Sequence, residues 1–310
     1  MNTEPKPVYT IEDLRQWREV TSALEHPARL AVFGWPVAHS RSPQMHEAAL
    51  KACGISMHYV RLEIAPDDLA EALQLCAKSD FLGVNLTVPH KTAALALIDD
   101  VDPHATRLGA VNTVLFENGK SSGFNTDGPG FVQAVRLGFG LDVRDLRVLV
   151  LGAGGGAGRG IATQCALEKS RRLVLTNRTI EKAEALSQDL LDCLHEAKVP
   201  GPMDRLLVVP FTPEALRAQM GNLDLVVNCT TIGMKRTDPS VLPREILAPH
   251  LVVLDTVYAA GRTKLMQAAE EAGARALGGL SMLLHQGALS FEIWFDRTAP
   301  LDAMEAALTR

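Results

Sequence analysis

From residue 30 onward, short apolar runs alternate with stretches of helical periodicity. The apolar runs of the first half cover residues 30–33, 58–62 and 82–86, the length expected of buried strands. The helical patterns that follow them cover residues 45–52, 66–78 and 89–98. Two of these patterns begin with a proline, Pro66 and Pro89. We expect both at the first helical position, where a missing N–H costs nothing.

A second alternating series begins near Arg147. Its apolar runs are VLVLGAG, RLVLTN, RLLVVPF, LDLVVNC, HLVVLDTVY and a short last run at residues 274–277. Strands that alternate with helices predict a parallel sheet covered by helices on both faces. Residues 282–296 then have the pattern of one more amphipathic helix.

The pattern divides the chain near Asp127, where FNTDGPG brings together two glycines and a proline. A chain of 310 residues is long enough for two domains of ordinary size, so we predict two α/β domains. Residues 1–29 precede the alternation and are interpreted as a helical appendage without an assigned role. Within it, Thr10 and Asp13 have the spacing of a capping box, and a helix would continue to about Leu24.

Composition excludes some classes of function. The net charge is −5 and the isoelectric point is near 6.0, which gives no electrostatic reason to expect nucleic acid or an anionic membrane as partner. No long apolar run and no signal-peptide pattern are present, so we expect a cytoplasmic protein. The five cysteines are scattered and are interpreted as reduced thiols, and the nine histidines include no HExxH, so no protein-held metal is expected.

The segment VLVLGAGGGAGRG is the first chemical signal, a strand followed by a glycine cluster and a helix. Gly152, Gly154 and Ala157 fit the variant G-x-G-x-x-A of the dinucleotide-binding turn. The first glycine permits the tight turn, the second lets the backbone approach a pyrophosphate, and the small third residue lets the helix pack on the strand. A glycine-rich turn can also be purely structural, but the strand before it and the helix after it favour a dinucleotide.

The residues after the next strand indicate which dinucleotide. A site for NAD usually places Asp or Glu there, to hold the ribose 2′-hydroxyl. This chain has Asn177, Arg178 and Thr179, with Lys182 one turn later. A guanidinium binds a 2′-phosphate through charge-assisted bonds, so the sequence predicts NADP; the alternative is a solvated helix start.

Polar side chains decorate four loop or strand-end segments of the first half. They are Ser40 and Ser42; Asn85, Thr87 and Lys91; Asn112; and Asn125, Thr126 and Asp127. Hydroxyl and amide groups around one lysine and one aspartate suit a small, polyhydroxylated substrate. The serines can instead cap a helix, Asn112 can be a turn residue and Asp127 can be a helix cap.

In this order, the motifs resemble those of the shikimate dehydrogenases. They are AVFGWPVAHSRSPQMH, GVNLTVPHK, LGAVNT, GFNTDGPGF, LGAGGGAG, TNRT, NCTTIGM, DTVY and GLSMLLHQGALSFEIW. The resemblance implies reversible, NADP-dependent reduction of 3-dehydroshikimate to shikimate in aromatic amino-acid biosynthesis. It implies a substrate domain of residues 30–126 plus 279–310, with a mixed or mostly parallel sheet to which the C-terminal helix returns. Residues 127–278 would form a Rossmann-like NADP-binding domain, and the protein would be a monomer or homodimer.

The resemblance also implies a role for individual residues. Lys91 would be the acid/base residue, with Asp127 as its partner. Substrate contacts would come from Ser40, Ser42, Thr87, Lys91, Asn112, Asp127, Tyr258 and Gln286. Cofactor contacts would come from Gly152, Ala153, Gly154, Gly155, Gly156, Asn177, Arg178, Thr179, Lys182, Thr256 and Gly279.

Two positions depart from the family pattern, and two other interpretations stay open. Thr231 and Ala260 stand where prolines are usual, and the second change could loosen the loop that carries Tyr258.

One alternative to this function is a quinate/shikimate dehydrogenase that uses NAD. The other is a non-catalytic regulator that binds the same metabolites, which would be expected to lack Lys91 or Asp127 or to carry an added basic segment. A glutamyl-tRNA reductase would need a catalytic cysteine and a basic surface, and neither pattern is present.

Overall fold

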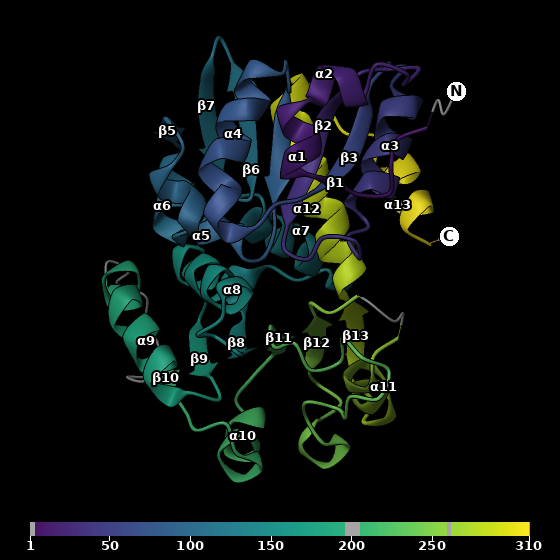
Figure 1. Cartoon of the computed structure of the whole chain (residues 1–310). Coiled ribbons are helices and arrows are strands. Elements are labelled where there is room, and N and C mark those ends of the chain that lie inside the picture. Colours follow the sequence, from purple (N-terminus) through teal and green to yellow (C-terminus); the bar gives the residue numbers. More distant parts are fainter. Residues whose placement is uncertain (1–3, 196–204, 259–261, 310) are drawn as a thin grey trace. The chain divides into compact units, whose positions relative to one another are not determined.

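The computed structural model describes residues 4–195, 205–258 and 262–309. It divides into unit 1, Met1–Thr126 with Gln286–Arg310, and unit 2, Asp127–His285. Each unit has its own sheet flanked by helices (Figure 1). The chain first leaves unit 1 at Asp127, within the FNTDGPG segment, and it re-enters unit 1 at Gln286 rather than at residue 279.

Unit 1 contains a mixed seven-stranded sheet in the order β1-β3-β2-β4-β6-β7-β5. The strands are β1 (Tyr9–Thr10), β2 (Ala28–Gly34), β3 (His58–Glu63), β4 (Gly83–Leu86), β5 (Asp100–Val101), β6 (Thr113–Glu117) and β7 (Lys120–Phe124). Only β6 is antiparallel to its neighbours, β4 and β7. The carboxyl ends of β2, β4 and β7 and the amino end of β6 therefore lie at one edge of the sheet.

Helices cover the sheet of unit 1. They are α1 (Ile11–Arg15), α2 (Trp17–Val20), α3 (Ser42–Ala52), α4 (Leu69–Lys78), α5 (His90–Ala93), α6 (Pro103–Leu108), α13 (Leu301–Thr309) and the part of α12 (Gly279–Phe295) from Gln286 on. Short 3₁₀ turns lie at η1 (Pro66–Asp68) and η2 (Ala94–Ala96). The single helix expected at 89–98 is wrong, because Pro89 precedes α5 and a 3₁₀ turn replaces the second half.

The N-terminal segment is part of unit 1, which corrects its interpretation as an appendage. Tyr9 and Thr10 pair in parallel with Leu62 and Glu63 of β3. The side chains of Ile11 and Leu14 in α1 and of Trp17 in α2 are buried in the same apolar core as the strands of unit 1. The Asp13 carboxylate does accept a hydrogen bond from the backbone N–H of Thr10 at 3.1 Å, as the capping spacing predicts.

Unit 2 contains six parallel strands in the order β10-β9-β8-β11-β12-β13. They are β8 (Arg147–Leu151), β9 (Arg172–Thr176), β10 (Leu206–Val208), β11 (Leu225–Asn228), β12 (Val252–Asp255) and β13 (Arg275–Gly278). Counted from β8, this is the order 3-2-1-4-5-6 of doubly wound dinucleotide-binding folds. In such sheets, ligands bind beyond the carboxyl ends of the strands where the order reverses, which here means the ends of β8 and β11.

Helices cover both faces of this parallel sheet. They are α7 (Asp127–Phe139), α8 (Gly156–Leu167), α9 (Ile180–His195), α10 (Pro213–Met220) and α11 (Lys264–Glu271), with 3₁₀ turns η3 (Val143–Asp145) and η4 (Arg244–Ile246). In β8, Val148 and Val150 belong to the core beneath α7, α8 and α9, while Leu149 and Leu151 belong to the core beneath α10 and α11. Alternate residues thus face opposite cores, as expected for a sheet that is buried on both sides.

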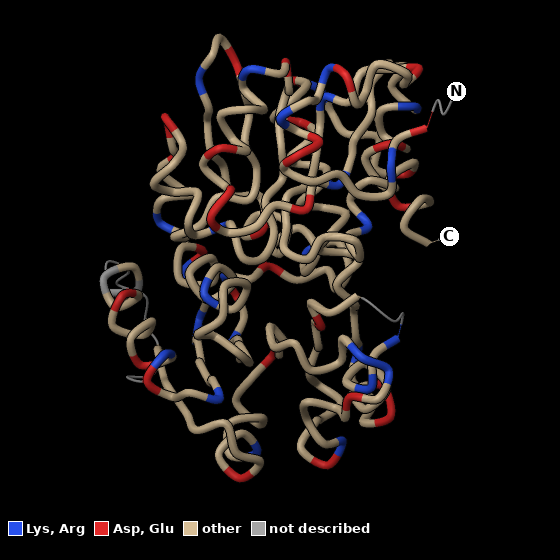
Figure 2. Tube along the Cα trace, in the orientation of Figure 1, with Lys and Arg blue, Asp and Glu red and all other residues tan. Residues whose placement is uncertain are grey.

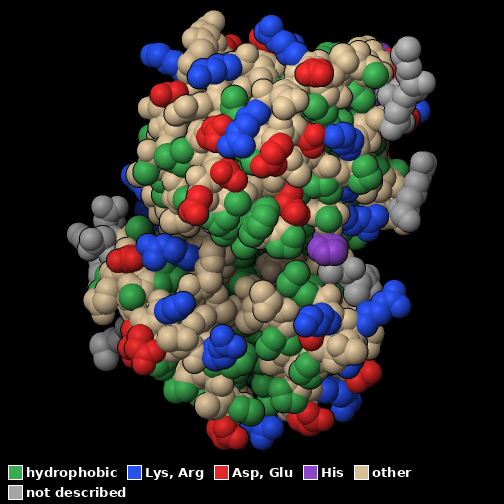
Figure 3. Space-filling model, in the orientation of Figure 1, with side chains coloured by type: hydrophobic (Ala, Val, Ile, Leu, Met, Phe, Trp, Pro, Cys, Tyr) green, Lys and Arg blue, Asp and Glu red, His purple; other side chains and the backbone are tan. Residues whose placement is uncertain are grey.

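Charged residues of both signs are interspersed along both units (Figure 2). The face drawn in Figure 3 likewise mixes Lys and Arg with Asp and Glu, and apolar side chains lie between them.

Across the described ranges, no helix combines the length and the apolar character needed to cross a membrane. The same ranges contain no group of three His, Cys, Asp or Glu side chains arranged to hold a metal ion.

Candidate active site

The loop after β2 carries the two predicted serines. Ser42 is buried and begins α3, and its backbone N–H donates to the hydroxyl of Ser40 at 3.3 Å. Arg61 of β3 donates to the Ser40 carbonyl oxygen from Nε at 3.1 Å and from Nη2 at 2.7 Å. Hydrogen bonds from a charged donor are stronger than neutral ones, so β3 holds this serine loop in place.

Thr87 and Lys91 follow β4 at the same edge of the sheet. The Thr87 N–H donates to the Phe33 carbonyl oxygen at 2.8 Å, and the Thr87 carbonyl accepts from His90 N–H at 2.9 Å. Lys91 lies in α5 with a half-buried side chain, and its carbonyl oxygen accepts from Val111 N–H at 2.8 Å. This bond ties the backbone of Lys91 to the residue next to Asn112.

Asn112, Thr126 and Gln286 form one buried cluster. The side-chain oxygen of Asn112 accepts from Thr126 N–H at 2.7 Å, and its amide nitrogen donates to the Thr126 hydroxyl at 2.9 Å and to Gln286 Oε1 at 3.3 Å. Asn112 is 1% exposed and Gln286 is 8% exposed. Unit 1 therefore brings together two predicted substrate residues that are far apart in the sequence.

Asp127 is the first residue of α7 and follows Thr126 directly in the chain. Its side chain is half-buried. It belongs to unit 2, whereas Lys91 belongs to unit 1. The pairing of Lys91 with Asp127 stays a prediction.

The glycine loop of unit 2 has the geometry of a phosphate cradle. Gly152 has a φ of 79°, which favours glycine, and the N–H groups of Gly152 and Ala153 donate to the Thr176 carbonyl at 2.9 and 3.1 Å. A Cβ on Gly154 would lie 2.5 Å from Lys182 Cβ, so only glycine fits between the loop and α9. Gly155 and Gly156 are exposed at the N-terminus of α8, where backbone N–H groups and the helix dipole favour an anion.

The small residue that packs the helix against the strand is Gly158, which corrects the role expected for Ala157. A Cβ on Gly158 would overlap the carbonyl oxygen of Gly152, whereas Ala157 is exposed. The close approach thus falls one residue later than the G-x-G-x-x-A pattern places it. Because this run contains several glycines, the sequence alone fits more than one register.

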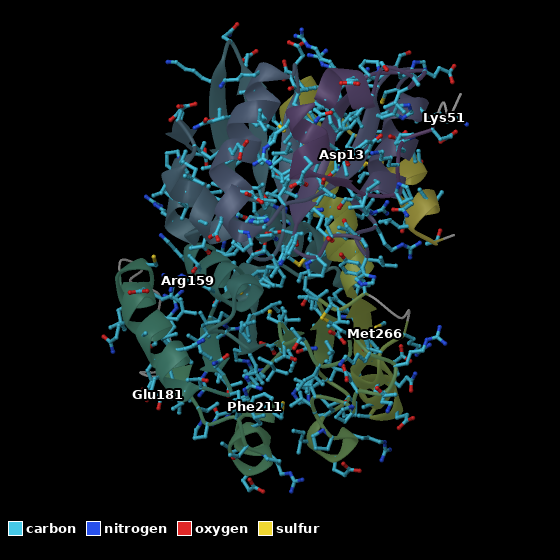
Figure 4. The ribbon with its side chains drawn as sticks, in the orientation of Figure 1. Asp13, Lys51, Arg159, Glu181, Phe211 and Met266 are labelled. Atoms are coloured by element: carbon cyan, nitrogen blue, oxygen red, sulfur yellow. The ribbon has the colours of Figure 1, made fainter. Side chains whose placement is uncertain are left out.

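The predicted 2′-phosphate residues lie beside this loop. Asn177 Nδ2 donates to the Thr179 carbonyl at 2.8 Å, and Lys182 N–H donates to the same carbonyl at 3.2 Å. Arg178, Thr179 and Lys182 are exposed. Figure 4 shows Glu181 at the start of α9 and Arg159 on α8. The two helices are joined by an ion pair, in which Arg159 Nη2 of α8 lies 2.9 Å from Asp189 Oδ2 of α9. The exposed basic groups after β9 fit a phosphate better than a free ribose hydroxyl.

Thr256 and Gly279 also meet in unit 2. A Cβ on Gly279 would overlap the carbonyl oxygen of Thr256, so glycine is required where α12 begins. The Thr256 N–H and hydroxyl both donate to the Asn228 carbonyl, at 3.0 and 2.8 Å. Tyr258 is half-buried. Ala260 lies outside the described residues, while Thr231 is exposed and its carbonyl accepts from Met234 N–H at 3.2 Å.

A buried pair at the ends of β11 and β12 was not singled out from the sequence. Asn228 Nδ2 donates to Asp255 Oδ1 at 2.9 Å, and the Thr263 hydroxyl donates to Asp255 Oδ2 at 2.6 Å. Burial raises the pKa of Asp255, and hydrogen bonds from Thr263, Val257 N–H and Asn228 partly offset that rise. The sequence feature that could have identified this pair is the polar residue that ends each of the two apolar runs.

Comparisons with known proteins agree with this geometry. Residues 32–114 match the family model described as the shikimate dehydrogenase substrate binding domain, and residues 279–309 match the shikimate 5′-dehydrogenase C-terminal domain. The shikimate dehydrogenase (NADP(+)) of Methanopyrus kandleri is 37% identical over 281 residues, which cover 90% of this chain and 94% of that protein. The protein of the same name from Symbiobacterium thermophilum is 40% identical over 90% of this chain and 92% of that protein.

Solved structures give the same relationship. A shikimate dehydrogenase in complex with NADP+ superposes with a TM-score of 0.82 at 33% identity, over 91% of this chain and 95% of that one. Shikimate 5-dehydrogenase from Thermus thermophilus, in complex with NADP(H) and shikimate, gives a TM-score of 0.79 at 37% identity, over 91% of this chain and 99% of that one. The chain belongs to the shikimate dehydrogenase family.

Proposed function

We propose that this chain catalyses the reversible, NADP-dependent oxidation of shikimate to 3-dehydroshikimate in chorismate and aromatic amino-acid biosynthesis. One observation carries the proposal: a structure that is 37% identical over 91% of this chain holds both NADP(H) and shikimate. The glycine cradle and the exposed basic residues after β9 support NADP, and the buried amide and hydroxyl cluster of unit 1 supports a polyhydroxylated substrate.

In this proposal, unit 1 binds the substrate. Hydroxyl and amide groups of Ser40, Ser42, Thr87, Asn112 and Gln286 hydrogen-bond its carboxylate and hydroxyls, with Tyr258 contributing from unit 2. The serine loop, the end of β4 and the start of β6 lie at one edge of one sheet, which supports their acting together. Buried amide groups that match a ligand hydroxyl also discriminate against analogues that lack it.

Lys91 would act as the acid/base residue. Oxidation of a secondary alcohol requires a base to remove the hydroxyl proton while hydride leaves the carbon. The Lys91 amine would take that proton in oxidation and return it in reduction, and the Asp127 carboxylate would orient the amine. NADP+, when bound, supplies the hydride acceptor. The short α5, anchored to Val111 through the Lys91 carbonyl, supports a fixed position for this side chain.

Unit 2 would bind the cofactor. The glycine loop Gly152–Gly156 would hold the pyrophosphate at the start of α8, while the N–H groups of Gly152 and Ala153 fix the loop to the Thr176 carbonyl. Asn177, Arg178, Thr179 and Lys182 would hold the 2′-phosphate. Thr256 and Gly279 would line the nicotinamide end, and the buried Asn228–Asp255 pair supports a rigid backbone there.

An assay with two substrates and two cofactors tests this function. Purified protein is mixed with shikimate or quinate and with NADP+ or NAD+, and the absorbance of the reduced nicotinamide is followed. We expect the highest kcat/KM for shikimate with NADP+. A higher value for quinate or for NAD+ would favour a quinate/shikimate dehydrogenase, and no turnover with any pair would favour a metabolite-binding regulator.

A cytoplasmic location and a monomeric or homodimeric state complete the proposal. NADPH-dependent biosynthesis is expected in the compartment that keeps this cofactor reduced. Size-exclusion chromatography with light scattering distinguishes a monomer of 33.5 kDa from a homodimer.

A further inference from the structure

Beneath the substrate residues of unit 1 lies Asn85, a buried residue of β4 that is 5% exposed. Its Oδ1 accepts a hydrogen bond from the Tyr59 hydroxyl at 2.7 Å. Its Nδ2 lies within hydrogen-bond distance of three acceptors, the Asn112 carbonyl oxygen at 3.1 Å and the hydroxyls of Thr113 and Ser290, both at 3.0 Å. Asn85 therefore contacts the residues that carry the substrate groups rather than the substrate edge itself.

Tyr59 determines which way the Asn85 amide faces. Tyr59 is 2% exposed, and burial raises its pKa well above the usual value, so the phenol stays protonated and can donate to Asn85 Oδ1. A donor opposite one end of an amide requires the oxygen at that end, so the NH₂ group must face the other side. There it faces the Asn112 carbonyl, which can only accept, and the hydroxyls of Thr113 and Ser290, which can accept as well as donate.

The ring of Tyr59 is itself held in place. His46 stacks on it with ring centroids 4.4 Å apart and an interplanar angle of 8°, and Trp294 lies 6.1 Å from it. The Trp294 indole N–H donates to the Val114 carbonyl at 3.0 Å. These rings are buried, so the phenol has little freedom to move away from Asn85.

The bonds from Asn85 reach both Asn112 and Gln286. The Asn112 carbonyl that accepts from Asn85 also accepts from Leu86 N–H at 2.8 Å. Ser290, one helical turn after Gln286, donates to the Gln286 carbonyl at 3.0 Å and shares a hydrogen bond with Thr113 at 2.8 Å. One amide on β4 thus ties the start of β6 to the turn of α12 that carries Gln286.

We propose that Asn85, oriented by Tyr59, is a positioning residue that holds Asn112 and Gln286 in the geometry that binds substrate. This inference rests on the proposed function, because it assumes that Asn112 and Gln286 contact the substrate. Asn85 acts through these two residues and not on the reacting atoms. Its loss should therefore affect the binding of the hydroxylated substrate and leave the binding of NADP+ unchanged.

The variant Asn85→Asp tests the inference, because it keeps the shape of the side chain and replaces the NH₂ donor by oxygen. When ionised, the new carboxylate repels the Asn112 carbonyl. When protonated, its O–H can donate as the amide did, and a buried carboxyl group protonates more readily than an exposed one. We expect KM for shikimate to rise about 5- to 100-fold at pH 8, the effect of a buried hydrogen bond left unmade, and to recover as the pH falls.

Tyr59→Phe is the second variant, since it keeps the stacked ring and removes the hydroxyl that donates to Asn85 and also hydrogen-bonds Ser42. We expect a smaller rise in KM for shikimate, with KM for NADP+ unchanged. Tyr9→Phe is the matched control, because Tyr9 is an equally buried tyrosine of the same sheet whose hydroxyl accepts from Lys6 N–H at 3.1 Å, away from this cluster. It should leave both KM values unchanged.

Three results would overturn the positioning role: an unchanged KM for shikimate in Asn85→Asp, an equal rise in both KM values, or no recovery at low pH. A crystal structure of Asn85→Asp at pH 8 adds a readout that does not depend on turnover. Displaced Asn112 and Gln286 side chains support the role, and unmoved ones contradict it whether or not shikimate is the substrate. The wild-type rate with shikimate reports separately on the proposed function.

Discussion

His46 is a fully buried histidine in the first half of α3, stacked on Tyr59 and 5.3 Å from the Trp294 ring. Within the part of the chain that the structure describes, neither ring nitrogen has a hydrogen-bond partner. Burial lowers the pKa of His46 from 6.5 to about 3, so the ring is neutral at physiological pH. Its neutral ring packs against the Tyr59 ring and does not act as an acid/base group.

This burial predicts a loss of stability in mild acid. The unfolded chain binds the proton near pH 6.5 and the folded chain only near pH 3, so the stability contributed by neutral His46 is complete above pH 6.5 and falls as the pH drops toward 3. Between pH 7 and pH 5 the free energy of unfolding should fall by about 2 kcal/mol on this account. Urea unfolding of wild type and His46→Phe measures it.

In His46→Phe that part of the pH dependence should disappear, whereas His250→Gln, at an exposed position, should keep it. An identical pH dependence in wild type and His46→Phe would contradict the assignment.

At the residue scale, the sequence correctly placed polar groups that lie directly next to a strand end. Thr87 and Asn112 follow or precede apolar runs, and the structure places both at the same sheet edge. Tyr59 and Ser290 were missed, because each lies within a strand or helix whose pattern only indicates burial. The spacing of Gln286 and Ser290, four residues apart on one helix, was the available signal.

At the scale of elements, the cofactor preference depends on the turn from β9 to α9. Arg178→Ala should raise KM for NADP+ about 10- to 100-fold, the effect of losing hydrogen bonds to a charged group, and change KM for NAD+ little. Steady-state kinetics with both cofactors measure this. Arg217→Ala, which removes an exposed arginine of α10, is the control. Equal effects on both cofactors, or none, would show that Arg178 does not read the 2′-phosphate.

The N-terminal segment predicts a stability effect that an appendage would not have. Trp17 is 5% exposed, packs against Tyr9 and Phe81, and donates from Nε1 to the Ala28 carbonyl at 3.3 Å. Trp17→Ala should lower the free energy of unfolding of unit 1 by about 3–5 kcal/mol, as for other buried large-to-small changes. Denaturant unfolding measures it, with Trp35→Ala, at a side chain 50% exposed, as the control.

A change below about 0.5 kcal/mol for Trp17→Ala, the range of surface substitutions, would restore the appendage interpretation.

Elements were predicted best where a single hydrophobic pattern extends over the whole element. The strands of unit 2 are long apolar runs and were found, whereas the hairpin of β6 and β7 was not singled out. Its two-residue turn, Asn118 and Gly119, has φ of 53° and 76°, and Asn-Gly is a strong hairpin signal. The error at residues 89–98 has a different cause, since the periodicity cannot distinguish a continuous helix from one turn of α-helix followed by a 3₁₀ turn.

At the scale of the whole molecule, the chain builds two units with separate sheets and cores. The alternation of strands and helices predicts a parallel sheet, but it does not give the order 3-2-1-4-5-6, because that order depends on which strands pair. The short helix α13, which packs on α3, was not expected, since it adds one brief apolar pattern after Pro300. The structure assigns Gln286–Arg310 to unit 1.

The division into two units predicts two separable patterns of ligand protection. Hydrogen exchange of backbone amides should slow in residues 152–158 and 176–182 when NADP+ binds. Addition of shikimate to that complex should then slow exchange in residues 40–44, 86–91 and 110–113. Exchange measured by mass spectrometry tests this. Protection of the unit 1 segments by NADP+ alone, with no further change on addition of shikimate, would contradict the assignment of substrate to unit 1.

The most direct test of the central claim is the initial rate of shikimate oxidation by wild type and by Lys91→Ala, followed through the absorbance of NADPH. The account predicts that wild type turns over and that the substitution lowers kcat by ~10²–10⁴, the usual contribution of an acid/base group, without changing the affinity for NADPH. Lys120→Ala, at an exposed lysine of the same unit, should behave as wild type. A Lys91→Ala protein with near-normal kcat would contradict the account.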